Sequence, residues 1–187
     1  MTGVSVGIDT STDWLSVALY SPAADEVIAS HESRAGRQHA SLLMPVVQQL
    51  LADARLEPAD ISAVGAGTGP GSYTGLRVGL ASARGLAGGL DVPLGGTVSL
   101  EAAAFRQLRP GQEAWLTIDA RRGNVYAARY SRGENTVICT AEPRKLPLSE
   151  LQEAQRPGLP VLEAGAPDAG WIARRATAGG DASALYL

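Results

Sequence analysis

The order of the predicted secondary structure in the first 108 residues narrows the possible folds more than any other feature of the sequence. Short apolar segments separated by polar turns predict an antiparallel meander, and the segments that follow alternate between helical and extended spacing. The predicted elements are strands at 3–9, 14–20 and 26–33, a helix around 42–54, a strand at 61–66, a helix at 73–87, a strand at 93–98 and a helix at 100–108. This is the order of one half of an actin-like or RNase H-like α/β fold, in which helices cover a mixed sheet.

A similar order begins again after a predicted hinge at Arg109-Pro110-Gly111. The first strand of each half ends in the same dipeptide, at Ile8-Asp9 and at Ile118-Asp119, and beyond residue 143 the pattern weakens. The predicted elements are strands at 115–119, 124–130 and 136–140, a helix at 149–155, a strand at 160–164 and a helix at 167–176. We therefore expect two lobes, an N-terminal RNase H-like lobe of residues 1–108 and a smaller, reduced C-terminal lobe of residues 109–187.

Charge and cysteine content exclude several classes of protein. Sixteen Lys and Arg residues against nineteen Asp and Glu residues give a net charge of −3, so independent binding to nucleic acid is not expected. Cys139, His31 and His39 are too few soft ligands for a zinc site, and we expect no metal site. The sequence has no apolar run of 18 residues and no signal-like start, which predicts a cytoplasmic protein without membrane contact.

Two segments that follow predicted strands suit phosphate oxygens. Small hydroxyl residues after a strand leave backbone N–H groups free, and glycines before a helix let backbone N–H groups approach an anion. These segments, with the second Ile-Asp strand end, supply the candidate nucleotide or phosphate residues Asp9, Thr10, Ser11, Thr12, Gly69, Gly71, Ser72 and Asp119. The alternatives are a hairpin turn at 9–13 and a tight strand-to-helix connection at 67–72, which lacks the Gly-Lys-Ser/Thr of a Walker loop.

The two long helices predicted in the first lobe carry faces that suit close packing. Gly75, Gly79 and Ala83 are four residues apart and form a smooth stripe, and the earlier helix has a wide apolar face. We expect these faces either to pack within the fold or to bind a partner. The candidate interface residues are Leu42, Leu43, Val46, Val47, Leu50, Gly75, Arg77, Gly79, Ala83 and Arg84.

The sequence offers no catalytic set. The two histidines lie on an early strand and at a helix entry, the sequence contains no His-x-x-x-His pair, and no nucleophile has a base at a predictable position. We therefore predict no catalytic residues.

Five short sequence motifs occur together in this chain. They are Asp9-Thr10-Ser11-Thr12, His39 with Leu42-Leu43-Met44-Pro45, Gly69-Pro70-Gly71-Ser72-Tyr73-Thr74-Gly75-Leu76-Arg77, Val92-Pro93-Leu94 through Val98-Ser99-Leu100, and Ile118-Asp119-Ala120-Arg121-Arg122-Gly123-Asn124-Val125-Tyr126. This set resembles the motifs of the bacterial TsaB family, also called YeaZ. The resemblance covers residues 3–130, whereas residues 140–185 match poorly and are followed by a family-like ending, Leu185-Tyr186-Leu187.

The resemblance implies an actin-like (ASKHA) fold and a non-catalytic, activating role in making N6-threonylcarbamoyladenosine (t6A) in tRNA. It implies a TsaD-like catalytic subunit and a TsaE-like ATPase as partners, a homodimer when the chain is alone, and contact with tRNA only through the complex. It implies no cofactor of the chain's own, with ATP or ADP at an interface of the complex left open. TsaD-like enzymes use a His-x-x-x-His metal pair, whereas this chain has His39 alone in that region.

An alternative function follows from the actin-like layout, because the two Ile-Asp strand ends would converge on the cleft between the lobes. It is a Mg-ATP-dependent ATPase or phosphotransfer enzyme that uses Asp9, Thr10 and Asp119 around Mg²⁺.

Overall fold

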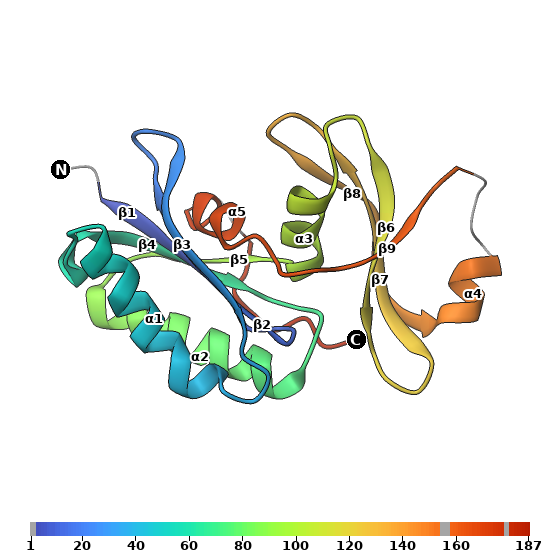
Figure 1. Cartoon of the computed structure of the whole chain (residues 1–187), viewed down its shortest axis with the longest axis horizontal. Coiled ribbons are helices and arrows are strands. Elements are labelled where there is room, and N and C mark those ends of the chain that lie inside the picture. The colour runs from blue at the N-terminus through green and yellow to red at the C-terminus, as the bar shows by residue number, and fades with distance from the viewer. Residues whose placement is uncertain (1–2, 154–157, 178–179) are drawn as a thin grey trace.

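The computed structural model of the chain describes residues 3–153, 158–177 and 180–187 and contains two mixed sheets side by side (Figure 1). The first has the strand order β3-β2-β1-β4-β5 and the second the order β8-β7-β6-β9. The strands are β1 Val4–Asp9, β2 Trp14–Ser21, β3 Glu26–Arg34, β4 Ile61–Gly67, β5 Leu94–Thr97, β6 Glu113–Asp119, β7 Asn124–Arg132, β8 Val137–Pro147 and β9 Val161–Glu163. The helices are α1 His39–Asp53, the 3-10 turn η1 Pro58–Asp60, α2 Tyr73–Leu90, α3 Ser99–Gln107, α4 Leu148–Glu153 and α5 Ala169–Arg174.

The first sheet has the expected topology. Strands β1, β2 and β3 pair antiparallel as a meander, and β4 and β5 add on in parallel beyond β1. Strand β1 lies in the middle of the sheet and is buried along its whole length. Asp9, its last residue, therefore ends at the carboxyl edge of the parallel strands, where open α/β sheets bind their ligands.

Helices α1 and α2 cover one face of the first sheet (Figure 1). Leu43 and Val47 of α1 and Leu80 and Ala83 of α2 belong to the same buried cluster as the strand residues. These are the inward positions of two helices with apolar residues three and four apart. The side of both helices that is turned away from the sheet stays open to solvent.

The sheet's other face is covered by α5, which lies close to the backbone of β1 and β4. A Cβ atom on Gly7 would lie 2.0 Å from the carbonyl oxygen of Ala169, and one on Gly65 would lie 2.4 Å from that of Ile172. Glycine in both central strands is therefore what lets this short helix sit directly on the sheet.

The second sheet is covered by α3, so the two lobes exchange helices. Leu100 and Ala104 of α3 pack with Leu116 of β6 and with Ala128 and Tyr130 of β7. Helix α3 precedes residue 109 and packs on the second sheet, whereas α5 follows it and packs on the first. The division of the chain into lobes of residues 1–108 and 109–187 stays a prediction.

Helices α3 and α5 meet through a stack of four side chains, which we call the interlobe stack. The rings of Phe105 and Trp171 are stacked with centroids 4.1 Å apart, and the Arg132 guanidinium lies 3.9 Å from the centre of the Phe105 ring. On the other side, the Arg175 guanidinium lies 5.5 Å from the centre of the Trp171 ring. The indole Nε1 of Trp171 also donates a hydrogen bond of 2.9 Å to Glu101 Oε1. Side chains from both lobes are thereby joined in one contact that is buried at Trp171 and Arg132 and partly exposed at Phe105 and Arg175.

Several predicted element ends are wrong for identifiable reasons. Helix α1 begins at His39, three residues before its predicted start, and Pro45 lies inside the helix. Helix α2 continues beyond its predicted end at residue 87 to Leu90, and its C-cap is Asp91, which adopts the left-handed conformation (φ 54°) that commonly ends helices. Helix α3 begins at Ser99, one residue before its predicted start, and the Ser99 hydroxyl donates to Asp9.

Candidate functional site

A cleft of about 470 Å³ lies between the turn that follows β1 and the hairpin that joins β6 to β7. It is lined by Ser11, Thr12, Asp13, Trp14, Arg34, Gly71, Ser72, Tyr73, Ile118, Asp119, Ala120, Arg121, Tyr126, Glu163 and Ala164. Five of the eight predicted phosphate residues therefore meet in one place, namely Ser11, Thr12, Gly71, Ser72 and Asp119. Asp9, Thr10 and Gly69 are buried and do not line the cleft.

Asp9 is fully engaged by its own neighbours. Its Oδ1 accepts hydrogen bonds of 2.7 Å from both the N–H and the hydroxyl of Ser11, and its Oδ2 accepts one of 2.6 Å from the Ser99 hydroxyl. The carboxylate thus ties the β1 end to its own turn and to the start of α3. Burial raises the pKa of Asp9 above the ordinary value of 3.8, against the opposing effect of the Ser99 and Ser11 donors.

The raised pKa of Asp9 predicts a specific dependence of stability on pH. A group whose pKa is higher in the folded state contributes stability that is complete below its unfolded pKa, about pH 4, and is lost as the pH rises through the folded value. We expect the free energy of unfolding of the wild type, relative to Asp9→Asn, to fall as the pH rises above about pH 4. Urea unfolding over this pH range measures it, and a difference that stays flat or grows with pH would contradict the assignment.

The glycines of the motif are explained by contact with the same turn. A Cβ atom on Gly67 would lie 1.8 Å from Asp9 Oδ2, and one on Gly71 would lie 2.0 Å from the carbonyl oxygen of Ser11. Gly75 and Gly79 continue the spacing of four. A Cβ on Gly75 would lie 2.1 Å from the Thr10 carbonyl oxygen, and one on Gly79 would lie 2.4 Å from the Thr10 hydroxyl. The β1 turn therefore rests directly on β4, the loop and α2.

The polar groups of the loop are also used within the chain. Thr10 Oγ1 donates a hydrogen bond of 2.7 Å to the Gly75 carbonyl, and the Ser72 N–H donates one of 2.6 Å to the Ser11 carbonyl. The Gly69 N–H donates to the Ser99 hydroxyl at 3.0 Å, and the Ser72 hydroxyl accepts from the Gly75 N–H as the N-cap of α2. These groups hold the fold together, and the nucleotide role of the cleft residues stays a prediction.

The residues predicted for a partner interface divide into two groups. Six of them, Leu43, Val47, Leu50, Gly75, Gly79 and Ala83, are buried within the lobe. Leu42 and Val46 are half-buried on α1, and Arg77 and Arg84 are exposed on α2. The smooth stripe thus faces the β1 turn and the sheet, while Arg84 donates a hydrogen bond of 2.7 Å to the Ala182 carbonyl of the C-terminal segment.

Other residues of the open helix face were missed by the sequence reasoning. Ala81 and Gly85 are exposed on α2, at steps of four residues from Arg77, and a Cβ on Gly85 would meet no atom within 4 Å. The same helical spacing that revealed the buried stripe could have placed them on the outer face. No sequence signal indicated that Tyr186 would lie beside Tyr73, with ring centroids 5.6 Å apart.

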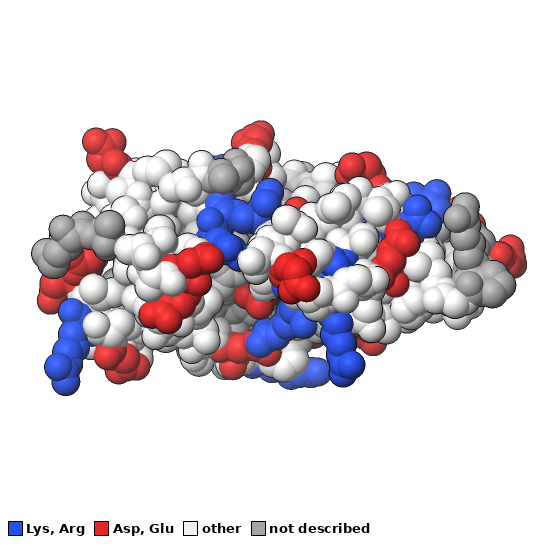
Figure 2. All heavy atoms as spheres, turned by 90° about the horizontal axis from the view of Figure 1, so that it is seen from above, with Lys and Arg blue, Asp and Glu red and all other residues white. Residues whose placement is uncertain are grey.

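The following absences hold for the described ranges 3–153, 158–177 and 180–187. There, no three or more His, Cys, Asp and Glu side chains gather closely enough to hold a metal ion. His39 is buried, with its Nε2 3.2 Å from the Trp14 carbonyl oxygen. Within these same ranges, no helix has the length and apolar character needed to cross a membrane. Figure 2 shows basic and acidic side chains interspersed over the face seen there.

Comparison with known proteins agrees with this architecture. The family model described as TsaD, tRNA N6-adenosine threonylcarbamoyltransferase, matches residues 25–184. The tRNA threonylcarbamoyladenosine biosynthesis protein TsaB of Escherichia coli K12 is 37% identical over 134 residues, which is 71% of this chain and 57% of that protein. The Bacillus subtilis 168 protein of the same name is 34% identical over 158 residues, 82% of this chain and 68% of its own length.

The fold has a close counterpart among solved structures. YeaZ from Pseudomonas aeruginosa superposes with a TM-score of 0.84 at 24% identity and covers 99% of this chain and 100% of that chain. The predicted actin-like fold with two mixed sheets is thus confirmed. By the matched family model and by its identity to the curated relatives, the chain belongs to the TsaB (YeaZ) family of tRNA threonylcarbamoyladenosine biosynthesis proteins.

Proposed function

We propose that this chain is a non-catalytic, activating subunit that binds a TsaD-like catalytic subunit in the complex that makes t6A in tRNA. The observation that carries the proposal is the state of the motif residues. Asp9, Thr10 and the Ser72 N–H are turned inward, onto Ser11, Ser99 and Gly75, where they hold the lobe together. Because these motif residues hydrogen-bond within the lobe, they fit a structural subunit better than a catalytic site.

The surface proposed for the partner is the outer face of α1 and α2, which we define by Leu42, Val46, Arg77, Ala81 and Gly85. In Figure 1 the two helices lie side by side under the first sheet, with this face turned away from it. Leu42 and Val46 are half-buried, and the other three are exposed. Small and apolar residues flanked by an arginine suit close packing against helices of another subunit.

The proposed surface predicts a selective loss of assembly. Ala81→Arg places a long cation on the exposed face, so it should leave the fold intact and lower co-purification with a TsaD-like subunit of the same organism by at least about tenfold. The matched control is Ala59→Arg in η1, another exposed alanine far along the chain, which should pair normally. Gly79, although on the same helix, is unsuitable because its Cβ would meet Thr10 Oγ1 at 2.4 Å.

Two results would count against separate parts of this proposal. Assembly of Ala81→Arg at wild-type affinity would show that the partner binds elsewhere. Modification of unmodified tRNA by the purified chain alone, with threonylcarbamoyl adenylate supplied, would show that the chain is itself a catalyst. We also propose that a TsaE-like ATPase joins the complex, that the chain alone forms a homodimer through the same face, and that tRNA is met only within the complex.

The alternative of a Mg-ATP-dependent enzyme is favoured by one observation, the meeting of Ser11, Ser72 and Asp119 at the cleft. The donor set fits a metal poorly, because the Asp9 carboxylate that was expected to hold it is fully hydrogen-bonded and buried. Calorimetric titration of the isolated chain with Mg-ATP, with Asp119→Asn as the comparison, tests this alternative. Binding heat and turnover that both disappear in the variant would support it.

A further inference from the structure

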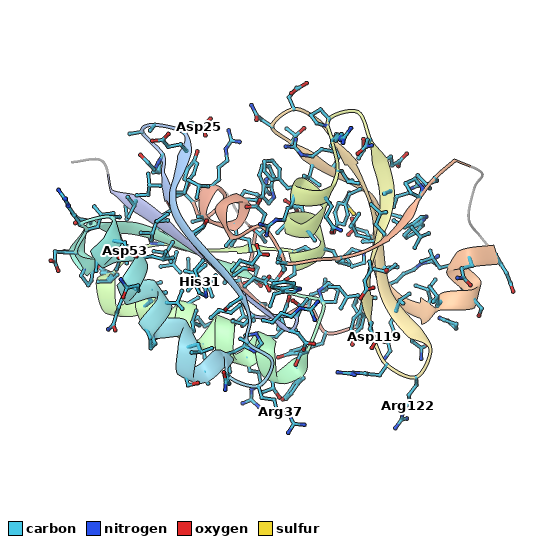
Figure 3. All side chains as sticks on the ribbon, viewed as in Figure 1. Asp25, His31, Arg37, Asp53, Asp119 and Arg122 are labelled. Carbon is cyan, nitrogen blue, oxygen red and sulfur yellow. The ribbon has the colours of Figure 1, made fainter. Side chains whose placement is uncertain are left out.

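Five arginines lie in, or within a few residues of, three separate segments that line the cleft, and we call them the cleft-rim arginines. They are Arg34, Arg37, Arg77, Arg121 and Arg122. Arg34 and Arg121 line the cleft itself, and the Arg77 guanidinium donates a hydrogen bond of 3.2 Å to the hydroxyl of Tyr73, another lining residue. Figure 3 shows Arg37 and Arg122 at the same edge of the molecule, both projecting outward, with Asp119 labelled above Arg122. The chain thus gathers cations at one opening.

The β6–β7 hairpin presents its two arginines in an unusual backbone conformation. Arg121, Arg122 and Gly123 have successive φ angles of 68°, 56° and 76°, in the left-handed region that side chains other than glycine rarely adopt. Asp119 Oδ1 accepts a hydrogen bond of 2.8 Å from the Arg121 N–H, and Asn124 Nδ2 donates to the carbonyls of Arg121 and Arg122 at 3.3 Å. Such a costly turn is held in place by its neighbours, as is common at binding sites.

Most of the cleft-rim arginines form no ion pair with a carboxylate among the described residues, as is also true of Arg55, Arg84, Arg109, Arg132 and Arg144. Elsewhere in the described chain, Arg106, Arg129, Arg174 and Arg175 each form an ion pair with a carboxylate. Among the cleft-rim arginines, the described residues contain one such contact, between Arg121 and Asp119 at 4.0 Å, and both side chains are largely exposed. Three carboxylates, Asp13, Asp119 and Glu163, line the cleft. Arg34 and Arg121 lie among these three carboxylates in the lining, and Arg37, Arg77 and Arg122 lie outside it, so the arginines outnumber the carboxylates only when the rim is counted with the lining.

Aromatic rings lie beside two of these cations. The Arg34 guanidinium lies 4.9 Å from the centre of the Trp14 ring, and that of Arg77 lies 5.4 Å from the Tyr73 ring. Trp14, Tyr73 and Tyr126 all line the cleft. Guanidinium groups suit phosphate oxygens because of their fixed fork of donors, and exposed rings suit unstacked bases. Cations spread around an opening match a chain of phosphates better than a single phosphate group.

From this arrangement we infer that the cleft-rim arginines bind phosphates of tRNA when the chain is assembled with its catalytic subunit. The inference rests on the proposed function, because a chain of net charge −3 is not expected to hold RNA alone. The rim adds contacts to an RNA that the partner already holds. The residues concerned are outside the proposed partner face except Arg77, which lies where the two surfaces meet.

The test uses the purified complex of this chain with a TsaD-like subunit and an unmodified tRNA transcript, with binding followed by fluorescence anisotropy at several salt concentrations. Arg121→Glu combined with Arg122→Glu should weaken tRNA binding on the order of tenfold and lower the slope of log affinity against log salt by about 2. Arg55→Glu combined with Arg109→Glu is the control, since it changes charge equally at two exposed positions away from the cleft. It should leave both quantities near the wild-type values.

The outcomes separate this inference from the proposed function. If the Arg121/Arg122 variant assembles normally and binds tRNA like the wild type, the inference is overturned while the proposed function stands. If the control pair weakens binding equally, the effect is one of overall charge, which also overturns it. If the variant loses binding of Mg-ATP in calorimetry but keeps its affinity for tRNA, the arginines serve a nucleotide phosphate and not RNA. Failure of the wild-type chain to assemble at all would instead remove the proposed function.

Discussion

Gly75→Ala should destabilise the protein by about 2–3 kcal/mol, although alanine is the better helix former. The added Cβ would lie 2.1 Å from the Thr10 carbonyl oxygen and 3.2 Å from its carbon, and both are backbone atoms that side-chain rotation cannot move. Helix α2 would have to retreat from the β1 turn, which would strain the 2.7 Å hydrogen bond from Thr10 Oγ1 to the Gly75 carbonyl. The cost of this overlap is larger than the helix propensity that alanine gains.

Gly85→Ala in the same helix is the matched control and should have the opposite sign. Gly85 is exposed and a Cβ there would meet no atom within 4 Å, so alanine should stabilise the protein by about 0.5–1 kcal/mol. Urea unfolding followed by circular dichroism measures both variants. Equal effects from the two substitutions would mean that helix propensity, and not contact with Thr10, decides the outcome.

Trp171→Ala should cost about 3–5 kcal/mol, because it empties the centre of the interlobe stack. Trp171 is buried, its ring stacks on Phe105 with centroids 4.1 Å apart, and its Nε1 donates to Glu101. Removal of the indole leaves a cavity between α3 and α5. It also removes one hydrogen-bond donor to Glu101, whose carboxylate keeps its ion pair with Arg175 at 3.3 Å. Equilibrium urea unfolding followed by circular dichroism gives the change in the free energy of unfolding.

Two further variants test whether the stack acts as a unit. Trp171→Phe keeps an aromatic ring against Phe105 and should cost only about 1–2 kcal/mol, for the lost hydrogen bond to Glu101 and the smaller ring. The double variant Phe105→Ala with Trp171→Ala should be less destabilised than the sum of the two single variants by about 1 kcal/mol. Simple additivity would mean that the two rings contribute to stability independently.

The strands and helices of the first lobe were predictable because their signals are local. Alternating and helical spacings set the order of β1 to α3, and each observed strand and α-helix in this stretch overlaps its predicted range, whereas the short turn η1 was not predicted. Strand β8 was predicted to stop at residue 140 but runs to Pro147. It is an edge strand whose residues are mostly exposed, so it lacks the apolar alternation by which a strand is recognised.

The tertiary roles of the motif residues were not predictable in the same way. The four-residue spacing of Gly75 and Gly79 indicated a smooth helix face, but nothing in the local sequence named Thr10 as the group that occupies it. The carboxylate of Asp9 was open to a ligand or to its own turn, and its second oxygen is held by Ser99, which lies 90 residues away. Contacts over such separations depend on the assembled fold and not on a sequence pattern.

Because α3 and α5 are exchanged between the two sheets, the chain should not be divisible into two independently folding fragments. A fragment that ends near residue 109 would carry α3 without the sheet it covers, and would leave the α5 face of its own sheet, around Gly7 and Gly65, bare to water. The complementary fragment would expose the apolar surface left by α3. Neither piece would be a self-sufficient module, so co-expressed halves should become soluble only by reassembling with each other.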